Sequence, residues 1–418
     1  MENLYIKGGR DLTGSLDVVT AKNALLPILA GSIISDKEIV IKKVALFSDV
    51  LFMTKILESL GSKVIIENDI LIINSSSADK YTVKDEFTKK VRSSIFMLGP
   101  LLSRFRKARV AYPGGCNIGN RPIDLHIKGL KCLNVKIEEK HGYIICDGRN
   151  MKAGEVHLDF PSVGATENIM MASVLLKGTT TIYNAAKEPE IEDLQNFLNA
   201  FGCKVKGAGS STITITGVEN FNDCEYTPIS DRIVTGTYLI ACAMCGGNIV
   251  LKGAKKEHNL ALINKIRQSG VTISARSNYI EIKCKSRPKS ISIIDTQPYP
   301  GFPTDLQNQI LAMQTISKGT SVVVENLFES RFKICNELSR MGANITIKDR
   351  MAIINGVNKL YGANVVATDL RGGAGLVLAG LTAEGYTTIE DIYHIDRGYL
   401  SIEEDLCKLN AEIKRCDK

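Results

Sequence analysis

The chain has 418 residues, of which 44% are hydrophobic and 23% charged, and its formal net charge is +7 at pH 7. This composition is that of an ordinary globular protein, long enough for two hydrophobic cores and without low-complexity segments. The charge suits an anionic ligand but is too dispersed for a nucleic-acid-binding tail. The most apolar stretch, residues 24–34, is too short to span a bilayer. No apolar run follows the charged N-terminus, so we expect a cytoplasmic protein without a signal peptide.

Six short segments repeat along the chain. In each, apolar helical residues lead into a glycine or asparagine, and a short alternating strand follows. These glycines and asparagines lie 68 to 73 residues apart, at Gly61, Asn134, Gly202, Gly270, Gly342 and Asn410. Because glycine and asparagine most readily take the left-handed conformation that ends a helix, the spacing indicates one structural repeat that occurs six times.

Each repeat is predicted to hold two helices and four short strands. The first helix, with the strand after it, falls within residues 21–41, 92–110, 164–182, 231–250, 305–324 and 369–389. These helices are apolar on nearly all sides and should be buried. The second helices, such as residues 191–198, mix charged and apolar residues and should face solvent. The last of them begins with a capping-box pattern at Ser401 to Glu404.

Buried helices wrapped by sheets indicate an inside-out α/β arrangement. Six repeats exceed one ordinary domain, so two lobes of three repeats are the simplest packing. Their boundary is expected in the polar segment 223–230, which contains Pro228.

One loop, residues 113–124, interrupts the repeat. Three glycines and two prolines frame Cys116 and Arg121. Glycines allow backbone motion and prolines fix the stems, so the loop could act as a lid, and a thiol near cations becomes reactive. The alternative is a surface turn with an incidental cysteine. By contrast, Cys242 and Cys245 lie within a predicted buried helix, where we expect them to be small core side chains.

Several charged residues stand at predicted helix starts. Lys22 is unusual there, because a helix N-terminus favours anions; it is either solvated or held by a bound anion. An aspartate at a helix start is usually only a cap. Helix starts should nevertheless converge at one end of each lobe, so we expect a ligand cleft between the lobes bordered by Lys22, Arg92, Asp231, Asp305 and Arg371.

At these residues the chain resembles the UDP-N-acetylglucosamine 1-carboxyvinyltransferase family of enolpyruvyl transferases over its whole length. The resemblance is carried by Lys22-Asn23, Arg92, the Cys116 loop, Arg121 to His126, Ser162 to Thr166, Glu188-Pro-Glu, Phe302 to Asp305, Asp369-Leu-Arg371 and His394 to Tyr399. It implies a two-lobed inside-out α/β barrel with six βαβαββ-type repeats. The first lobe would span residues 22–229 with the Cys-bearing lid. The second would span 230–418 together with residues 1–21.

The resemblance also implies the reaction. The enolpyruvyl group of phosphoenolpyruvate would pass to the 3-hydroxyl of UDP-N-acetylglucosamine (UDP-GlcNAc) with release of phosphate, the first committed step of peptidoglycan precursor synthesis. No metal or organic cofactor, membrane or nucleic acid is implied, and the sequence makes no prediction of the oligomeric state. Cys116 would be the general acid and the target of fosfomycin, and Asp305 the base. Lys22 and Arg397 would complete the catalytic residues.

Two sets of binding residues follow from the resemblance. Phosphoenolpyruvate would be bound by Lys22, Asn23, Arg121, Arg371 and Arg397. UDP-GlcNAc would be bound by Arg92, Arg121, Pro122, Ile123, Asp124, Leu125, Ser162, Val163, Asp305 and Leu327. The chain departs from the family pattern at Val19-Thr20, Phe160-Pro161, Leu327 and Gly372-Gly373, so we expect slightly shifted affinities.

Two other readings compete with this one. The first is 5-enolpyruvylshikimate-3-phosphate (EPSP) synthase, which shares the fold and phosphoenolpyruvate but lacks the Cys-bearing loop. The second is a DNA clamp, which needs basic residues along its inward helices, whereas the inner helices here are apolar.

Overall fold

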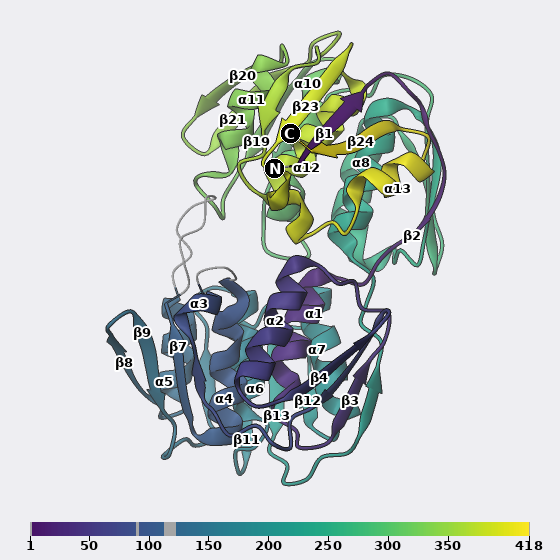
Figure 1. The fold of residues 1–418 in the computed structure, drawn as a ribbon. Coiled ribbons are helices and arrows are strands. Elements are labelled where there is room, and N and C mark those ends of the chain that lie inside the picture. Colours follow the sequence, from purple (N-terminus) through teal and green to yellow (C-terminus); the bar gives the residue numbers. More distant parts are fainter. Residues whose placement is uncertain (1, 89–91, 113–122, 418) are drawn as a thin grey trace. The chain divides into compact units, whose positions relative to one another are not determined.

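The computed structural model describes residues 2–88, 92–112 and 123–417, and these form two compact units (Figure 1). The first unit comprises residues 20–229 and the second residues 2–19 with 230–417, each within the described ranges. Thr20 and Ala21, expected in the second lobe, belong to the first unit: the Thr20 hydroxyl donates to the Lys43 carbonyl at 2.8 Å and the Ala21 N–H to the Ile229 carbonyl at 2.8 Å. Within the described ranges, no helix is long and apolar enough to cross a membrane.

Each unit contains three mixed sheets of four strands, with one parallel edge pair and two antiparallel pairs in each sheet. In spatial order, the sheets of the first unit are β14 (Cys224–Tyr226), β3 (Glu38–Ile41), β5 (Ile70–Asn74), β4 (Lys63–Glu67); β6 (Thr82–Val83), β7 (Lys107–Ala111), β9 (Tyr143–Asp147), β8 (Lys136–Lys140); and β10 (Glu155–His157), β11 (Thr179–Tyr183), β13 (Thr212–Thr216), β12 (Lys204–Lys206). Those of the second unit are β16 (Thr272–Ala275), β17 (Tyr279–Cys284), β15 (Gly247–Lys252), β2 (Leu12–Asp17); β18 (Ile293–Asp295), β19 (Thr320–Val324), β21 (Met351–Asn355), β20 (Asn344–Lys348); and β22 (Asn364–Val366), β23 (Tyr386–Glu390), β1 (Glu2–Lys7), β24 (Glu412–Asp417).

The helices alternate between inner and outer positions. The inner ones are α1 (Lys22–Ser32), α4 (Leu98–Phe105), α6 (Val163–Ser173), α8 (Arg232–Cys245), α10 (Gln307–Ile316) and α12 (Leu370–Thr382). The others are α2 (Ser48–Ser59), α3 (Asp85–Thr88), α5 (Asp124–Cys132), α7 (Pro189–Ala200), α9 (Leu260–Gln268), α11 (Ile334–Arg340) and α13 (Ile402–Lys408). Short 3-10 turns are η1 (Arg92–Met97), η2 (Glu257–Asn259), η3 (Thr304–Leu306), η4 (Arg331–Lys333) and η5 (Ile392–Arg397).

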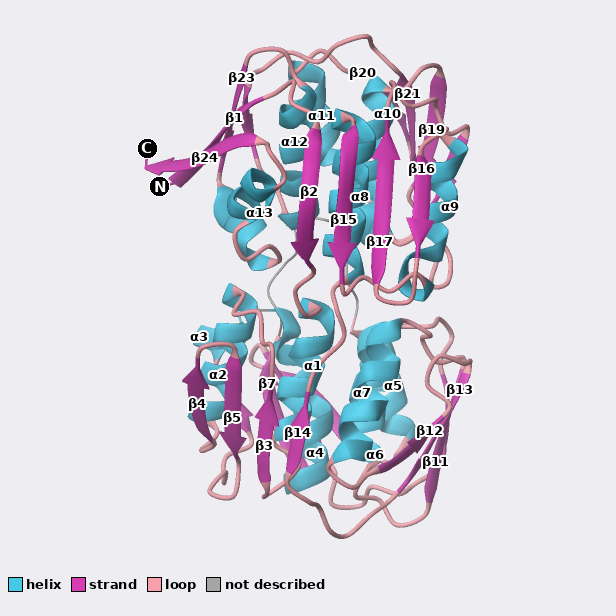
Figure 2. Cartoon of the chain, turned by 90° about the vertical axis from the view of Figure 1, so that its right-hand side faces the viewer, coloured by secondary structure: helices cyan, strands magenta, loops and turns pink. Residues whose placement is uncertain are grey.

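The inner helices form the cores, as predicted. Nearly every residue of α8, α10 and α12 is buried, and these three helices pack against one another. In the first unit α4 packs against α6, and α1 against α2 and α7. Sheets surround the helices; Figure 2 shows the sheet of β2, β15, β17 and β16 beside α8. The inside-out α/β fold is therefore confirmed, and the apolar faces of the inner helices leave no basic channel for a clamp.

The six repeated glycines and asparagines end their helices in the predicted conformation. Each has a positive φ, between 63° at Asn134 and 109° at Gly202. The expected capping box is only partly correct, because Ser401 is the N-cap of α13 but its side chain makes no capping bond. Cys242 is fully buried in α8, and burial raises the pKa of its thiol to about 12, so the prediction of a core cysteine is confirmed there. Cys245, the last residue of α8, is only half-buried.

Three strands complete sheets far from them in sequence. β2 pairs in parallel with β15, β1 lies between β23 and β24, and β14 pairs with β3. The N-terminal segment thus completes two sheets of the second unit, as the resemblance implied.

Two arginines satisfy carbonyl groups at the ends of inner helices. Arg104 donates to the carbonyl of Ile33, the C-cap of α1, at 2.7 Å, and to that of Ser75, which follows β5, at 2.6 Å. Arg287 donates to the carbonyls of Ile316, the last residue of α10, and of Val357 at 2.6 Å. Such bonds satisfy C-terminal carbonyls that a helix leaves without partners.

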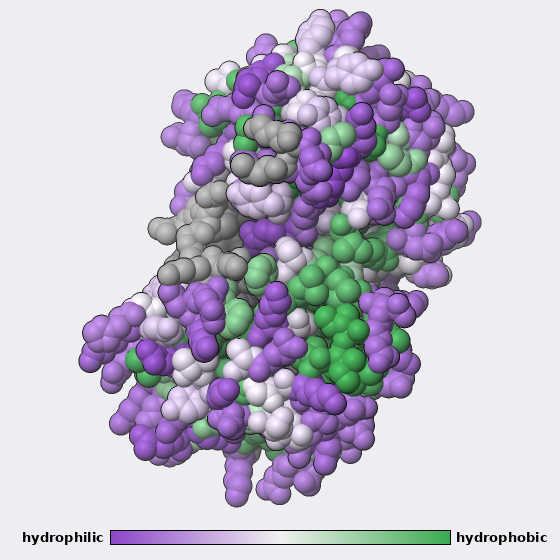
Figure 3. Space-filling model, in the orientation of Figure 1, coloured by the Kyte–Doolittle hydropathy of each residue, from purple (hydrophilic) through white to green (hydrophobic). Residues whose placement is uncertain are grey.

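The face drawn in Figure 3 is mostly hydrophilic, with an apolar area on the first unit. Exposed large hydrophobic side chains of that unit include Leu51 on α2 and Ile66 on β4. Nothing in the structure shows what covers them.

Candidate functional site

Two of the aspartates at helix starts are structural caps. One oxygen of Asp231 accepts the N–H groups of Ile233 at 2.7 Å and Val234 at 2.9 Å, at the start of α8. Asp369 caps α12 in the same way, with the N–H groups of Arg371 and Gly372 both at 3.0 Å. The ordinary reading of a helix-start aspartate is correct for both residues.

Asp305 differs from these caps. It lies in η3, before α10, and its two oxygens contact two arginines: Arg331 Nη2 at 2.7 Å and Arg371 Nη2 at 2.9 Å. The arginine side chains are 1% and 6% exposed, whereas the Asp305 side chain is 25% exposed. The carboxylate thus joins two buried guanidinium groups to the surface, where a ligand can reach it.

Arg371 keeps its charge despite its burial. Burial alone disfavours the cation, but the charges of Asp305, Tyr399 and Asp231 outweigh it and raise the pKa of Arg371 above its usual value. Of the five charged residues expected to converge, the structure brings together Asp231, Asp305 and Arg371. Lys22 lies in the first unit, and the Arg92 side chain lies outside the described part of the chain.

Arg397 ends η5 on an anchored segment. The buried Tyr399 hydroxyl bonds to Thr237 Oγ1 at 2.7 Å and to Gln309 Nε2 at 3.4 Å, which ties this segment to α8 and α10. Burial and the positive charge of Arg397 lower the pKa of His394 from its usual value, which favours the neutral imidazole. The second unit therefore holds Asp305, Arg371 and Arg397.

In the first unit, Lys22 is the first residue of α1 and is buried. Its Nζ lies 3.0 Å from Asp49 Oδ2 on α2, and both side chains are under 10% exposed. The alternative of a solvated lysine is therefore wrong. The partner of Lys22 here is the carboxylate of Asp49, and a bound anion at Lys22 stays a prediction. Asn23 follows, half-buried, in the same turn.

The starts of α5 and α6 lie side by side. Ile123 is the N-cap of α5, and Asp124 and Leu125 form its first turn. The Ser162 hydroxyl caps α6 by accepting the Ala165 N–H at 3.4 Å, and Val163 begins that helix. His126, in the first turn of α5, packs against Gly164 at the start of α6. Its Nδ1 lies 2.8 Å from Nδ2 of Asn168, in the second turn of α6. This arrangement groups five of the residues expected to bind UDP-GlcNAc.

The remaining predicted residues fall into two groups. Leu327 follows β19 in the second unit, and its N–H donates to Glu325 Oε1 at 2.8 Å. Cys116, Arg121 and Pro122 lie outside the described residues.

Sequence reasoning missed Arg331 and Asp49, the partners of Asp305 and Lys22. A buried arginine in Glu329-Ser-Arg331-Phe reads like any surface arginine, because burial depends on the tertiary fold. Asp49 had one weak signal, its place in the first turn of a helix.

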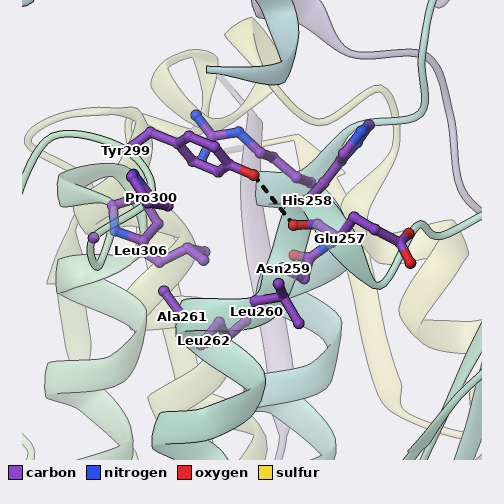
Figure 4. A pocket seen from close by; sticks show the side chains of 12 residues that line it. Glu257, His258, Asn259, Leu260, Ala261, Leu262, Tyr299, Pro300 and Leu306 are labelled. Carbon is purple, nitrogen blue, oxygen red and sulfur yellow. Dashed lines mark hydrogen bonds between the residues drawn. The ribbon is translucent and has the colours of Figure 1, made fainter. Parts of the chain in front are cut away.

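The second unit contains a small cavity whose lining includes residues on either side of Asp305 in the sequence (Figure 4). Its volume is about 30 Å³ and it is lined by Arg232, His258, Tyr299, Pro303 and Leu306 among others. Such a volume holds roughly two water molecules. Burial, with Lys255 and Arg232 nearby, lowers the pKa of His258 to about 4. Its Nδ1 has no hydrogen-bond partner among the described residues, so the cavity suits ordered water better than an organic ligand.

Within the described ranges, no group of three or more histidine, cysteine, aspartate or glutamate side chains could hold a metal ion.

Comparisons with known proteins cover the whole chain. The sequence model of the family described as EPSP synthase (3-phosphoshikimate 1-carboxyvinyltransferase) matches residues 6–406. UDP-N-acetylglucosamine 1-carboxyvinyltransferase 2 of Caldanaerobacter subterraneus subsp. tengcongensis is 50% identical over 415 residues, covering 99% of this chain and all of its own. UDP-N-acetylglucosamine 1-carboxyvinyltransferase 1 of Carboxydothermus hydrogenoformans is 46% identical, covering 99% of this chain and 98% of its own.

Two solved structures show the same fold. An enolpyruvyl transferase from Streptomyces tendae superposes with a TM-score of 0.88 at 19% identity, covering 99% of this chain and 98% of its own. An EPSP synthase from Acinetobacter baumannii superposes with a TM-score of 0.79 at 17% identity, with full coverage of both chains. At these identities the likeness concerns the fold alone.

Proposed function

The chain belongs to the family of UDP-N-acetylglucosamine 1-carboxyvinyltransferases, and from this premise we propose that it transfers the enolpyruvyl group of phosphoenolpyruvate to the 3-hydroxyl of UDP-GlcNAc, with release of phosphate. The observation that carries the proposal is the Asp305 carboxylate, partly exposed and held by the buried Arg331 and Arg371. Family membership identifies the acceptor, since the relatives of this name are 44% to 50% identical over nearly the full chain. The product would enter peptidoglycan precursor synthesis in the cytoplasm, and thereby serve cell-wall biogenesis, shape and division.

Asp305 is proposed to accept the proton of the sugar 3-hydroxyl. Two guanidinium contacts stabilise the ionised carboxylate, so Asp305 enters the reaction as an acceptor. The hydroxyl oxygen bonds to C2 of phosphoenolpyruvate while a general acid delivers a proton to C3. Loss of a C3 proton then expels phosphate and restores the double bond. Cys116 is proposed as the acid, and hence as the cysteine that fosfomycin alkylates.

The cations of the chain suit phosphoenolpyruvate, which carries a carboxylate and a phosphate. Lys22, Arg371 and Arg397 provide the positive charge, with Arg121 and Asn23 as further contacts, and arginine forks bind such groups in two places. Lys22 and Arg371 are buried and paired with Asp49 and Asp305, so their positions are set before the substrate arrives.

The adjacent starts of α5 and α6 suit the diphosphate of the nucleotide sugar, because backbone N–H groups at helix N-termini bind anions. Ile123 to Leu125, Ser162 and Val163 lie there. Leu327, Arg92, Arg121 and Pro122 complete the proposed set.

One experiment separates the possible acceptors. Phosphate release from phosphoenolpyruvate is measured with UDP-GlcNAc, with shikimate 3-phosphate and with no acceptor. We expect release with UDP-GlcNAc alone, and a product heavier than UDP-GlcNAc by one enolpyruvyl group. Release with shikimate 3-phosphate would favour the EPSP synthase reading. After fosfomycin treatment, mass spectrometry should find a single adduct, on the peptide that contains Cys116.

A further inference from the structure

A glutamate in the second unit is fully buried and has no role in the proposed reaction. Glu325 directly follows β19, and its side chain is 0% exposed. Its own N–H donates to the Arg350 carbonyl at 2.9 Å, which fixes the backbone at this point. A buried carboxylate is costly unless hydrogen bonds satisfy it, so its partners indicate what it holds in place.

The two oxygens of Glu325 face different segments. Oε1 accepts the N–H groups of Leu327 at 2.8 Å and Phe328 at 3.0 Å, which folds the chain after β19 into a tight turn. Oε2 accepts the hydroxyl of Thr304 at 2.8 Å. Thr304 directly precedes Asp305 in η3, so Glu325 connects the turn to the segment that carries the proposed base.

The chain after β19 makes a second contact with η3, the segment that carries Asp305. Arg331, at the far end of the turn, donates to Asp305 Oδ1 at 2.7 Å. Its guanidinium group lies 5.3 Å from the centre of the Phe328 ring, and the Phe328 N–H is one of the donors to Glu325. Residues 325–331 thus hold Thr304 with a carboxylate at one end and Asp305 with a guanidinium at the other.

We propose that Glu325 is a positioning residue, which orients Asp305 through Thr304 and holds Leu327 in place through the turn. This inference rests on the proposed function for the roles of Asp305 and Leu327. Glu325 itself touches no substrate: its carboxylate is buried, and its three bonds go to neutral protein donors. It fixes the direction of the Asp305 side chain and the position of Leu327 with one side chain.

Two substitutions separate positioning from charge. In Glu325→Gln, the amide oxygen still accepts both N–H groups and the amide nitrogen donates to the Thr304 hydroxyl oxygen, so the connection survives without the charge. In Glu325→Ala, both sides of the connection are lost. We expect Glu325→Gln to keep kcat within about threefold of wild type, and Glu325→Ala to lose about tenfold to a hundredfold, since several buried hydrogen bonds are removed together. The KM for phosphoenolpyruvate should change less than about twofold, and that for UDP-GlcNAc should rise.

Thr304 provides a second variant, in case Glu325→Ala does not fold. Thr304→Val removes only the bond to Oε2 and should lower kcat about fivefold to tenfold, with the turn intact. Thr304→Ser keeps the hydroxyl and should behave as wild type. The matched control is Glu337→Ala, on α11 of the same unit. The Glu337 side chain is 15% exposed and accepts the Val366 N–H at 3.1 Å, so its loss should lower stability and leave kcat unchanged.

Amide hydrogen exchange tests the connection without any assay of activity. The Leu327 and Phe328 amides should exchange slowly in wild type and in Glu325→Gln, and fast in Glu325→Ala. Fast exchange only in the alanine variant, with the kcat order above, supports the proposal. Equal kcat in Glu325→Ala and wild type, or a glutamine variant as impaired as the alanine variant, would overturn it. If wild-type protein releases no phosphate with UDP-GlcNAc, the proposed function fails, while the exchange result still decides whether Glu325 holds the turn.

Discussion

The two units share one repeat but begin their inner helices differently. In the second unit, Asp231 and Asp369 turn back to cap α8 and α12. By contrast, α10 begins at Gln307 with Leu306 as its N-cap and no side-chain cap, and Asp305 contacts two arginines instead. In the first unit, Ser162 caps α6, while α1 and α4 begin without a side-chain cap. The proposed site residues Lys22, Arg92 and Asp305 all lie at or just before these three uncapped starts.

This comparison separates two uses of one sequence position. A polar side chain that caps its own helix stabilises that helix. The charged side chains of Lys22 and Asp305 do not cap a helix and are instead held by residues of other elements, Lys22 by Asp49 and Asp305 by Arg331. Side chains such as Lys22 and Asp305 can bind a ligand, because they are fixed in place and do not use their charge to cap a helix.

The largest expected effect tests Asp305 against Asp231. Asp305→Asn should lower kcat by about 10²-fold to 10⁴-fold, as for loss of a general base. Asp231→Ala should instead lower stability by about 0.5–2 kcal/mol through loss of a cap, and Asp231→Ser should restore it. Steady-state kinetics and urea unfolding measure the two effects. A larger loss of kcat in Asp231→Ala than in Asp305→Asn would reverse the assignment of cap and site.

The repeat made the architecture predictable, but not the roles of the aspartates. Gly61 and Asn410 reveal helix ends because their left-handed conformation is a local property of residue type. Whether Asp305 or Asp231 is the cap depends on Arg331, which lies 26 residues after Asp305, and on Arg371, which comes from the next repeat. For the same reason, periodicity alone did not predict which strands the edge strands β2 and β14 would pair with.

The second prediction compares corresponding helix ends in the two units. Arg104→Met removes donors from the end of α1, and Arg287→Met removes them from the end of α10. Each variant leaves several partly buried carbonyls without partners and should lose about 2–4 kcal/mol of unfolding free energy. Hydrogen exchange should rise near residues 33–35 in the first variant and near 316–317 in the second. Arg149→Met, at an exposed ion pair, serves as control and should leave the free energy of unfolding close to that of wild type. Exchange that rises equally in both units would show that these helix ends are not held separately.

The third prediction tests whether a cation from each unit, the buried Lys22 and the half-buried Arg397, serves the same substrate. Lys22→Ala and Arg397→Ala should each lower kcat/KM for phosphoenolpyruvate about tenfold to a hundredfold, because a charged hydrogen bond contributes roughly 1.5–3 kcal/mol. UDP-GlcNAc affinity, measured by calorimetry, should remain close to wild type. Asp49→Asn should reproduce part of the Lys22→Ala effect, since Asp49 positions the ammonium group. Loss of UDP-GlcNAc binding alone in either cation variant would mean that the two subsites are interchanged.

The smallest expected effect concerns His258, beside the small cavity. Its folded pKa of about 4 lies below the usual value of 6.5, so the unfolded chain takes up the proton more readily. The stability linked to His258 is therefore complete above about pH 6.5 and is lost as the pH falls towards 4. Because the side chain is partly exposed, we expect about 1–2 kcal/mol, less than the full shift would imply.

The variant His258→Asn should remove this part of the pH dependence. Urea unfolding at pH 7 and pH 4.5 should show a smaller loss of stability on acidification in His258→Asn than in wild type. The matched control is His141→Asn, at an exposed turn of the first unit, which should keep the wild-type pH dependence. The positively charged Lys255 and Arg232 and the carboxylate of Glu257 act on His258 from its surroundings. A Lys255→Met variant should raise the pKa of His258, and the loss of stability between pH 7 and pH 4.5 should then be smaller than in wild type. If wild type and His258→Asn lose equal stability between the two pH values, burial beside the cavity does not hold His258 in its neutral form.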